Sequence, residues 1–392
     1  MFACQRNIFS KNLAQRSFFS FSTSTNSSKT LFDKYKLGDY TLPNRIVMSS
    51  MSRCRADYKT AIPNELHVKY YSQRAKAGLI LTESSPITNQ AQAFHGACGI
   101  WNLQQVEGWK KVTEAVHKEG GRIFLQLWHG GRTCRSVVTG EEVIAPSSIK
   151  VRSNPREGLP PYETPREMRD EDIKYVTNQY YQAAKKAKLS GFDGIELDGS
   201  LGSLVDQFLK DATNHRTDDY GGSIENRCRF TLELMEILAD VYGPGKVGIK
   251  LSPVGRDQDM YDSNPVELFN HLLKELNDIG IAYVHFVEPN EQVSGPIYYE
   301  PGEKQIPNVC KQFRDRFNGT IIANNNLTPE TGLQKIRNGE ADLVSFGRYF
   351  ISNPDLVDRI KNNWPLNENW DPDTFYTPGA KGYTDYPCYQ PK

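Results

Sequence analysis

The chain has 392 residues, and 47 Lys and Arg residues balance 47 Asp and Glu residues, so its formal net charge is zero. Because binding to a phosphate backbone needs a basic excess, we expect no nucleic acid partner. Hydrophobic residues make up 38% and charged residues 24% of the chain, which excludes a largely disordered protein. No run of eighteen apolar residues occurs, so the sequence predicts no transmembrane segment.

The N-terminal stretch differs in composition from the rest. From Met1 to Phe32 there are four basic residues, seven serines and no acidic residue. Without those four, the chain has 43 basic and 47 acidic residues. A basic, serine-rich, acid-free N-terminus is typical of a mitochondrial presequence, and an ordinary disordered tail is the alternative. We therefore expect residues 1–30 to be a presequence-like tail, residues 31–392 to be the folded domain, and the protein to be mitochondrial.

Beyond the tail, short apolar segments rich in β-branched residues alternate with amphipathic patterns. We expect strands at Arg45–Met51, Gly78–Glu83, Arg122–Trp128, Gly194–Asp198, Val247–Ser252, Tyr283–Pro289, Thr320–Asn324 and Leu343–Gly347. We expect helices at Glu65–Ala77, Gln104–Glu119, Asp170–Leu189, Ser223–Val241, Pro265–Ile279, Lys304–Phe317, Pro329–Asn338 and Asn353–Lys361. Strand and helix alternating eight times predict an α/β fold, a single (β/α)₈ TIM barrel, with a doubly wound open sheet as the alternative.

Two loops that follow predicted strands are long. The loop after the third strand, His129 to Arg169, is rich in proline, and Asn290 to Glu303 follows the sixth strand. Both loops leave the C-terminal ends of strands, where barrel enzymes place their active sites. They could form a lid over the barrel mouth or be solvated excursions.

The glycines and cysteines indicate neither a dinucleotide-binding motif nor a metal site. Gly243, Gly245 and Gly248 match GxGxxG, but a helix precedes them and a strand follows, so we expect a helix stop and a turn and not a dinucleotide fingerprint. Seven cysteines are dispersed without a CxxC, and seven histidines without an HExxH. This pattern indicates reduced thiols and no metal site.

Long polar side chains occur at the ends of the predicted strands. They are Ser52, Arg53, Gln126, Asp198, Lys250 and Arg348. A barrel interior is filled mainly by branched apolar side chains, so these polar groups need partners. A bound cofactor and mutual hydrogen bonding are the two interpretations. Asn324–Asn326 and Gly347–Arg348 end the last two strands, where barrels commonly bind phosphate.

Several segments of the chain carry distinctive motifs. They are "NRIVMSSMSRCRA", "YYSQRAKAGLILTE", "GGRIFLQLWHGGR", "LVDQFLKDATNHRTDDYGGSIENRCRF", "GIKLSP", "ADLVSFGRYFISNPDL" and "GYTDYP". These segments, in this order, resemble the old yellow enzyme family of FMN-dependent ene reductases. The resemblance implies an FMN-bearing barrel that takes hydride from NAD(P)H and passes it to a small-molecule acceptor. It implies cofactor-binding roles for Ser52, Gln126, Lys250, Asn325, Asn326, Gly347 and Arg348, and a substrate cavity lined by Trp101, Trp128 and Tyr376.

Two of these cofactor positions carry unusual residues. Lys250 replaces the family's arginine beside flavin N1, which keeps the charge but loses the planar fork. Asn325 stands where a glycine that contacts the phosphate is usual.

The catalytic positions implied by the resemblance are all replaced. In "ELDGSLGSLVDQF", Asp198 and Leu201 stand where the family has two donors to the substrate carbonyl, and Ser203 where it has a proton-donating tyrosine. An ionised aspartate only accepts hydrogen bonds and a leucine makes none. One interpretation is an FMN oxidoreductase whose acceptor is a quinone, oxygen or an unusual substrate, with Asp198 holding a cation or, if protonated, donating. The other is a barrel that lost its activity and serves as a structural subunit of a mitochondrial complex.

Overall fold

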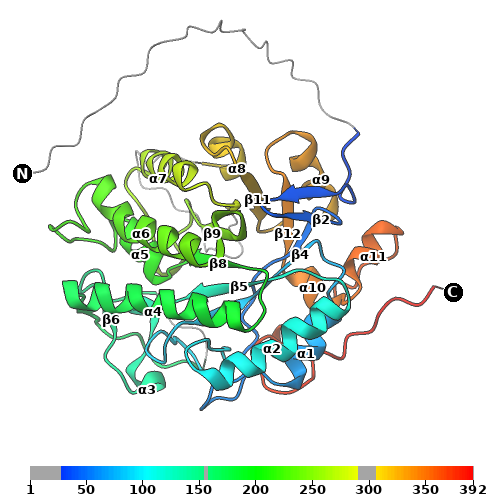
Figure 1. The fold of residues 1–392 in the computed structure, drawn as a ribbon, viewed down its shortest axis with the longest axis horizontal. Helices are drawn as coiled ribbons and strands as arrows, with labels where there is room; N and C mark the ends of the chain where they lie inside the picture. Colours follow the sequence, from blue (N-terminus) through cyan, green and yellow to red (C-terminus); the bar gives the residue numbers. More distant parts are fainter. Residues whose placement is uncertain (1–27, 154–157, 290–305, 392) are drawn as a thin grey trace, which may run out of the picture.

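A computed structural model describes residues 28–153, 158–289 and 306–391 (Figure 1). Its centre is a closed barrel of parallel strands. In chain order these are β3 (Ile46–Met48), β4 (Leu79–Pro86), β5 (Ile123–Trp128), β8 (Gly194–Gly199), β9 (Val247–Leu251), β10 (Tyr283–Val287), β11 (Thr320–Asn324) and β12 (Leu343–Phe346). Each strand pairs with its neighbour in the sequence, and β12 closes on β3. The predicted (β/α)₈ barrel is confirmed, and the open sheet is excluded.

Helices surround the strands as the alternation predicts (Figure 1). They are α1 (Glu65–Ser72), α2 (Leu103–Lys118), α4 (Asp170–Leu189), α6 (Ile224–Tyr242), α7 (Pro265–Ile279), α8 (Val309–Phe313), α9 (Pro329–Arg337) and α11 (Leu356–Lys361). Their apolar faces pack against the outer faces of the strands and form one large core with them. Both faces of each strand are therefore buried, which explains why the strands are continuously apolar.

Several boundaries differ from the sequence prediction; β4, for example, continues to Pro86 instead of ending at Glu83. The strand predicted at Arg45–Met51 is β3 only, because the chain after Met48 turns into the barrel mouth. The helix predicted to end at Ala77 ends at Ser72, where Arg74 instead donates to the carbonyls of Phe350 and Ile351. The sixth helix begins only at Val309, after an Asn308 cap, and Lys304 lies outside the described residues. The last helix begins at Leu356, because a separate turn of helix, α10 (Arg348–Ser352), precedes it.

A hairpin that the sequence analysis missed closes the N-terminal end of the barrel. Strands β1 (Tyr35–Leu37) and β2 (Tyr40–Leu42) pair antiparallel, and their leucines pack into a small cluster with residues from the bottoms of the strands. Its turn contacts the glycine-rich segment, where the Asp39 N–H donates to the Gly245 carbonyl. Gly243 ends α6 with φ +86°, and β9 follows, so the helix-stop interpretation of the glycine motif is confirmed.

The described residues of the proline-rich loop after β5, 129–153 and 158–169, are folded. The loop contains a short helix, α3 (Ser136–Thr139), and a two-stranded parallel sheet formed by β6 (Ile144–Ala145) and β7 (Arg166–Glu167). Its Arg132 donates to the Gln258 carbonyl in the loop after β9, so the two loops meet beyond the C-terminal ends of the strands. The loop therefore lies at the mouth and is not a solvated excursion. The other long loop, Asn290 to Glu303, lies outside the described residues.

Candidate functional site

A cavity of about 740 Å³ opens at the C-terminal ends of the barrel strands. Its wall brings together segments from the first, fifth and last three strands, as expected for a barrel site. The lining residues from these segments include Ser49–Arg53, Lys250, Val287, Asn324–Asn326, Gly347 and Arg348. Six of the seven predicted cofactor-binding residues line this one cavity, and Gln126 lies directly beneath it.

Gln126 and Lys250 point into the barrel and meet at one serine. Gln126 Nε2 donates to Ser50 Oγ at 2.9 Å, and Lys250 Nζ donates to the same oxygen at 3.1 Å. Gln126 Oε1 accepts from Ser84 Oγ at 2.6 Å. Mutual hydrogen bonding thus satisfies part of these polar groups, while Lys250 still lines the cavity and can reach an acceptor there. Mutual hydrogen bonding is therefore confirmed for Gln126 and Lys250, and a role in cofactor binding stays a prediction.

A buried polar network supports the floor of the cavity, and the sequence analysis missed it. Glu196 Oε1 accepts from Gln126 Nε2 at 2.7 Å, and its Oε2 lies 2.9 Å from His285 Nδ1. His285 Nε2 lies 2.8 Å from Ser345 Oγ, which also accepts from Asn324 Nδ2. A lone polar residue within an apolar strand, as in "GIELD" and "YVHFV", was the available signal.

Charge within this network is set by burial and by neighbouring cations. Burial tends to raise the pKa of Glu196, but His285 and Lys250 lower it more, so the net shift is below its usual value. Burial lowers the pKa of His285 against the opposing effect of Glu196. We infer an ionised carboxylate that accepts from a neutral imidazole, which fixes the floor of the cavity in one arrangement.

Phosphate-binding features gather at the ends of β11 and β12. Asn325 and Asn326 have φ values of +85° and +53°, a left-handed backbone that Asn tolerates better than other non-glycine residues. The backbone path that a glycine would take at position 325 is therefore retained, with Asn325 Nδ2 bonded to the Glu288 carbonyl at 2.8 Å. Arg348 is exposed at the cavity, 5.5 Å from the Trp370 ring centroid.

These features fit FMN, because the cavity is lined by a cation, a hydroxyl and a guanidinium from Lys250, Ser52 and Arg348. Ser52, Gln126 and Lys250 would hold the isoalloxazine ring, and Gly347 and Arg348 the phosphate. No ion pair with Arg348 occurs within the described residues, so its charge is available to a phosphate. Bound FMN would supply the chemistry of accepting a hydride from NAD(P)H and passing it to an acceptor.

The predicted aromatic positions separate in the structure. Tyr376 lines the 740 Å³ cavity. Trp128 instead lines a neighbouring pocket of about 340 Å³, with Phe94 and Tyr162. Trp101 begins the turn before α2, where its N–H donates to Gln105 Oε1 at 2.7 Å. All three were predicted to line one substrate cavity, and only Tyr376 lines the 740 Å³ cavity.

Asp198 is the last residue but one of β8 and lies on the same face of the strand as Glu196. Its side chain is 8% exposed, and Oδ1 accepts from the hydroxyl and the N–H of Ser200 at 2.7 and 3.1 Å. Burial raises the pKa of Asp198 to about 6, although Lys250 and Ser200 act in the opposite direction. Above pH 6 this position therefore carries a negative charge.

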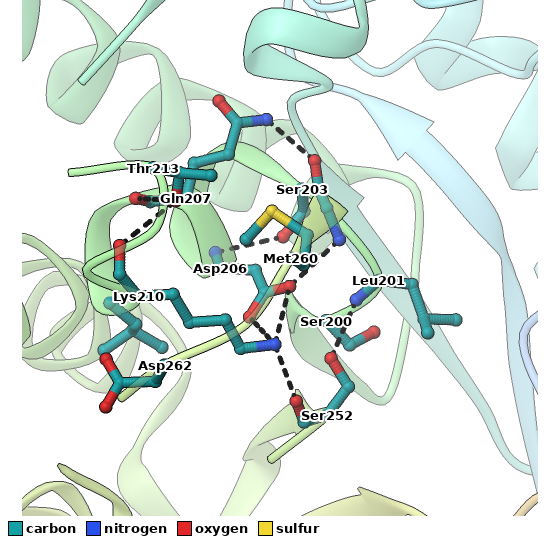
Figure 2. Close-up of polar contacts among 12 residues, drawn as sticks. Ser200, Leu201, Ser203, Asp206, Gln207, Lys210, Thr213, Ser252, Met260 and Asp262 are labelled. Atoms are coloured by element: carbon teal, nitrogen blue, oxygen red, sulfur yellow. Dashed lines mark hydrogen bonds and ion pairs between the residues drawn. The ribbon is translucent and has the colours of Figure 1, made fainter. Parts of the chain in front are cut away.

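Leu201 and Ser203 lie on the turn between β8 and helix α5 (Leu204–Leu209) (Figure 2). Leu201 lines the cavity, is 36% exposed and has φ +48°. Ser203 is buried and caps α5: its hydroxyl donates to the Asp198 carbonyl at 2.7 Å and accepts from the Asp206 N–H at 3.3 Å. Of the three divergent positions, Asp198 and Leu201 are therefore at the mouth, whereas the Ser203 hydroxyl has a structural role.

Side chains from α5 hold this turn in place (Figure 2). Asp206 accepts from the Gly202 N–H at 3.0 Å and forms a fully buried ion pair with Lys210, 3.0 Å from Oδ1 to Nζ. Lys210 also donates to the Ser252 carbonyl at 2.8 Å, and the Ser252 hydroxyl accepts from the Leu201 N–H. Gln207 bridges the Gly202 carbonyl to the loop after β5. These contacts set the position of Leu201 at the mouth.

Away from the cavity, three potential metal ligands lie close together. One ligand atom each from His67, Glu83 and Cys98 lies within 4.8 Å of the others, and all three side chains are buried. Distant positions in the sequence thus meet despite the dispersed pattern. Burial raises the pKa of Glu83 to about 7 and lowers that of His67 to about 3. The six described cysteines are free thiols, as the pattern predicts.

No helix within the described residues is long and apolar enough to cross a membrane.

Comparison with known proteins identifies the family. A model of the NADH:flavin oxidoreductase / NADH oxidase family matches residues 30–367. The putative 12-oxophytodienoate reductase 11 of Oryza sativa subsp. japonica is 40% identical over 370 residues, which cover 92% of this chain and 98% of that protein. The flavin oxidoreductase hxnT of Emericella nidulans is 40% identical over 380 residues, covering 92% and 98%.

Solved structures agree in fold. The old yellow enzyme homologue of Zymomonas mobilis matches with a TM-score of 0.86 at 37% identity, covering 92% of this chain and all of that one. Morphinone reductase matches with a TM-score of 0.86 at 40% identity, covering 93% and 98%. The chain therefore belongs to the NADH:flavin oxidoreductase / NADH oxidase family and is an FMN-dependent NAD(P)H oxidoreductase of the old yellow enzyme type.

Proposed function

We propose that this oxidoreductase reduces an acceptor other than a simple enone and is weak on cyclic enones. The observation that carries the proposal is the chemistry of the barrel mouth, where Asp198 and Leu201 occupy the two positions that would hold a substrate carbonyl. The names of the relatives, 12-oxophytodienoate reductase and morphinone reductase, describe substrates with an oxo group. A mouth that repels a developing oxyanion is not suited to such substrates.

Hydride transfer to an enone builds negative charge on the carbonyl oxygen, and positioned donors stabilise that charge. Asp198 is an acceptor when ionised, and Leu201 presents only an apolar side chain. The loss of one such donor lowers the rate by about 10²–10³, and here neither position supplies one. Ser203 does not replace the missing proton donor, because its hydroxyl already donates to the Asp198 carbonyl.

The experiment is to restore the family's residues and measure enone reduction. In flavin-loaded protein, Asp198→His, Leu201→Asn and Ser203→Tyr together should raise NAD(P)H-dependent turnover of 2-cyclohexenone by more than the product of the single changes. Because Ser203 is a helix cap, the triple variant should also lose about 1 kcal/mol of stability, which thermal unfolding would record. Brisk enone reduction by the unaltered protein would contradict the proposal.

The location that we propose is the mitochondrion. The proposal rests on the basic, acid-free stretch before Leu31, which lies mostly outside the described residues. Fusion of residues 1–32 to a fluorescent protein should direct it to mitochondria, and a variant with Arg6, Lys11 and Arg16 replaced by Glu should not be imported.

A second candidate is a barrel kept as a structural subunit of a mitochondrial complex. The same three replaced positions favour it, because a subunit without catalysis is free to lose them together. The two candidates differ in flavin chemistry. A purified protein that carries FMN and oxidises NAD(P)H in the presence of an acceptor supports the oxidoreductase, whereas an empty barrel recovered with partner proteins supports the subunit.

A further inference from the structure

One oxygen of the Asp198 carboxylate is poorly satisfied at the mouth of the barrel. Oδ1 is held by Ser200, whereas Oδ2 has one long contact, 3.4 Å from Ser84 Oγ. A hydroxyl has a single proton, and that of Ser84 has the shorter acceptor Gln126 Oε1 at 2.6 Å. Oδ2 therefore keeps acceptor capacity although the side chain is more than nine-tenths buried. Buried carboxylate oxygens ordinarily have donors, so the structure leaves a place for one.

The cation nearest in the barrel wall does not fill that place. Asp198 and Lys250 are Cα partners on β8 and β9, yet they form no ion pair within 4.0 Å in the described chain. Lys250 Nζ instead donates to Ser50 Oγ and lines the cavity. Asp198 is thus left as a negative charge next to the wall of the cavity, which is lined by its strand partner Lys250 and by Leu201 three residues further on.

We propose that the electron acceptor of this enzyme is an organic cation with a C=N⁺ bond, an iminium or an N-alkylated heteroaromatic ring, held by the Asp198 carboxylate. This inference rests on the function proposed above and names its substrate class. A change from a carbonyl substrate to a cationic one accounts for the residues at all three divergent positions, Asp198, Leu201 and Ser203.

Reduction of such a cation needs neither oxyanion donors nor a proton donor. The iminium carbon receives one hydride, which is two electrons and one proton, from the reduced flavin that NAD(P)H regenerates. A C–H bond forms, the π pair of the C=N bond moves onto nitrogen, and the product is a neutral amine. Negative charge does not develop on the substrate, so a carboxylate in place of a donor stabilises the bound cation. No carbon is left to protonate, so Ser203 is free to cap α5.

Side chains around the cavity suit a cation with an apolar body. Leu201, three residues after Asp198, presents an apolar side chain to the cavity. Tyr376 and Phe375 line the same cavity, and aromatic faces attract cations. A cavity with apolar and aromatic walls and a carboxylate behind them is a chemical match for a heterocyclic ammonium group, and a poor match for a phenolate or a carboxylate.

A binding measurement tests the inference without turnover. Oxidised, flavin-loaded protein is titrated at pH 7.5 with N-methylisoquinolinium and with its neutral isostere 2-methylnaphthalene, and binding is read from the flavin absorption spectrum. We expect the cation to bind at least about tenfold more tightly than the isostere. Asp198→Asn should abolish this preference and leave the affinity for 2-methylnaphthalene within about twofold. Asp373→Asn, which removes an exposed carboxylate three residues from Tyr376, is the matched control and should keep the preference.

Two results would overturn the inference: equal affinity for cation and isostere, or a cation preference that survives Asp198→Asn. If Asp198→Asn fails to load flavin, the unaltered protein still decides, because its affinity for the cation alone should fall below pH 6. The groups that face Asp198 and act on this titration are Lys250 on β9, Glu196 on β8 and Tyr180 on α4.

Turnover separates this inference from the proposed function. Brisk reduction of 2-cyclohexenone would contradict the proposed function, whatever affinities are measured for the cation and its isostere. Poor enone reduction with no cation preference would keep the proposed function and reject the cationic acceptor. NAD(P)H-dependent reduction of N-methyl-3,4-dihydroisoquinolinium to the tertiary amine, lost in Asp198→Asn, would support both.

Discussion

Replacing Lys210 by methionine removes the cation from a fully buried ion pair that holds the turn at the barrel mouth. Asp206 and Lys210 are 0% and 1% exposed, and Nζ lies 3.0 Å from Oδ1 (Figure 2). Methionine keeps much of the side-chain volume, so the perturbation is mainly electrostatic. Asp206 would keep the Gly202 N–H but would carry an unpaired charge away from water.

Breaking a buried pair in this way typically destabilises a protein by about 3–5 kcal/mol. An unfolding entropy of about 2.1 cal/mol/K per residue gives roughly 0.8 kcal/mol/K for a barrel of about 360 residues, so the Tm of Lys210→Met should fall by about 4–7 °C. The double variant Asp206→Asn/Lys210→Met should lose less than the sum of the single losses, because neither charge is then left alone.

Scanning calorimetry of the flavin-loaded variants measures these shifts. Lys76→Met is the matched control, because Lys76 pairs with Asp358 at 2.7 Å while its side chain is 70% exposed, and exposed pairs contribute about 0–1 kcal/mol. The reasoning fails if Lys210→Met shifts the Tm no more than Lys76→Met does, or if the two single losses simply add in the double variant.

Four further predictions concern the cavity. Arg348→Ala should weaken FMN binding about tenfold, and Arg348→Lys should weaken it less, because the guanidinium–phosphate pair is charge-assisted. Fluorescence titration of the apoprotein with FMN measures this, and an Arg348→Ala affinity equal to that of the unaltered protein would remove Arg348 from the phosphate site. Lys250→Ala should lower the flavin reduction potential by roughly 30 mV for each 1.4 kcal/mol of lost hydroquinone stabilisation. An unchanged potential in a redox titration would show that Lys250 does not lie beside the flavin. Asn325→Gly should leave FMN affinity intact whereas Asn325→Ala should lower it, since φ at this position is +85° and a left-handed residue other than glycine costs about 1–2 kcal/mol. Because Asp198 has a pKa of about 6 and binds a cation only when ionised, affinity for N-methylisoquinolinium should be about tenfold weaker at pH 5 than above pH 7, and a flat pH profile would exclude Asp198 as the anchor.

The sequence by itself determined the barrel and which residues would line the candidate cofactor cavity. Strands buried on both faces must be continuously apolar, and eight of them alternating with amphipathic helices leave few folds open. Because all the parallel strands have their C-terminal ends at the same end of the barrel, polar residues at those ends lie close together. That is why Lys250, Asn325 and Arg348, distant in the sequence, were predicted for one site and line one cavity.

Other features were decided only by the tertiary structure. Trp128 was expected in the cavity but lines a neighbouring pocket, because the direction of a side chain beyond the strand end depends on the loops packed around it. Ser203 was interpreted as a failed proton donor, yet its hydroxyl caps α5, a role set by the three-dimensional path of the turn. The network of Glu196 and His285 joins strands that are remote along the chain, so a lone polar residue in each apolar strand marks its members but not their pairing. The single long contact of Asp198 Oδ2 is likewise a property of distances between side chains, and those distances exist only once the barrel has closed.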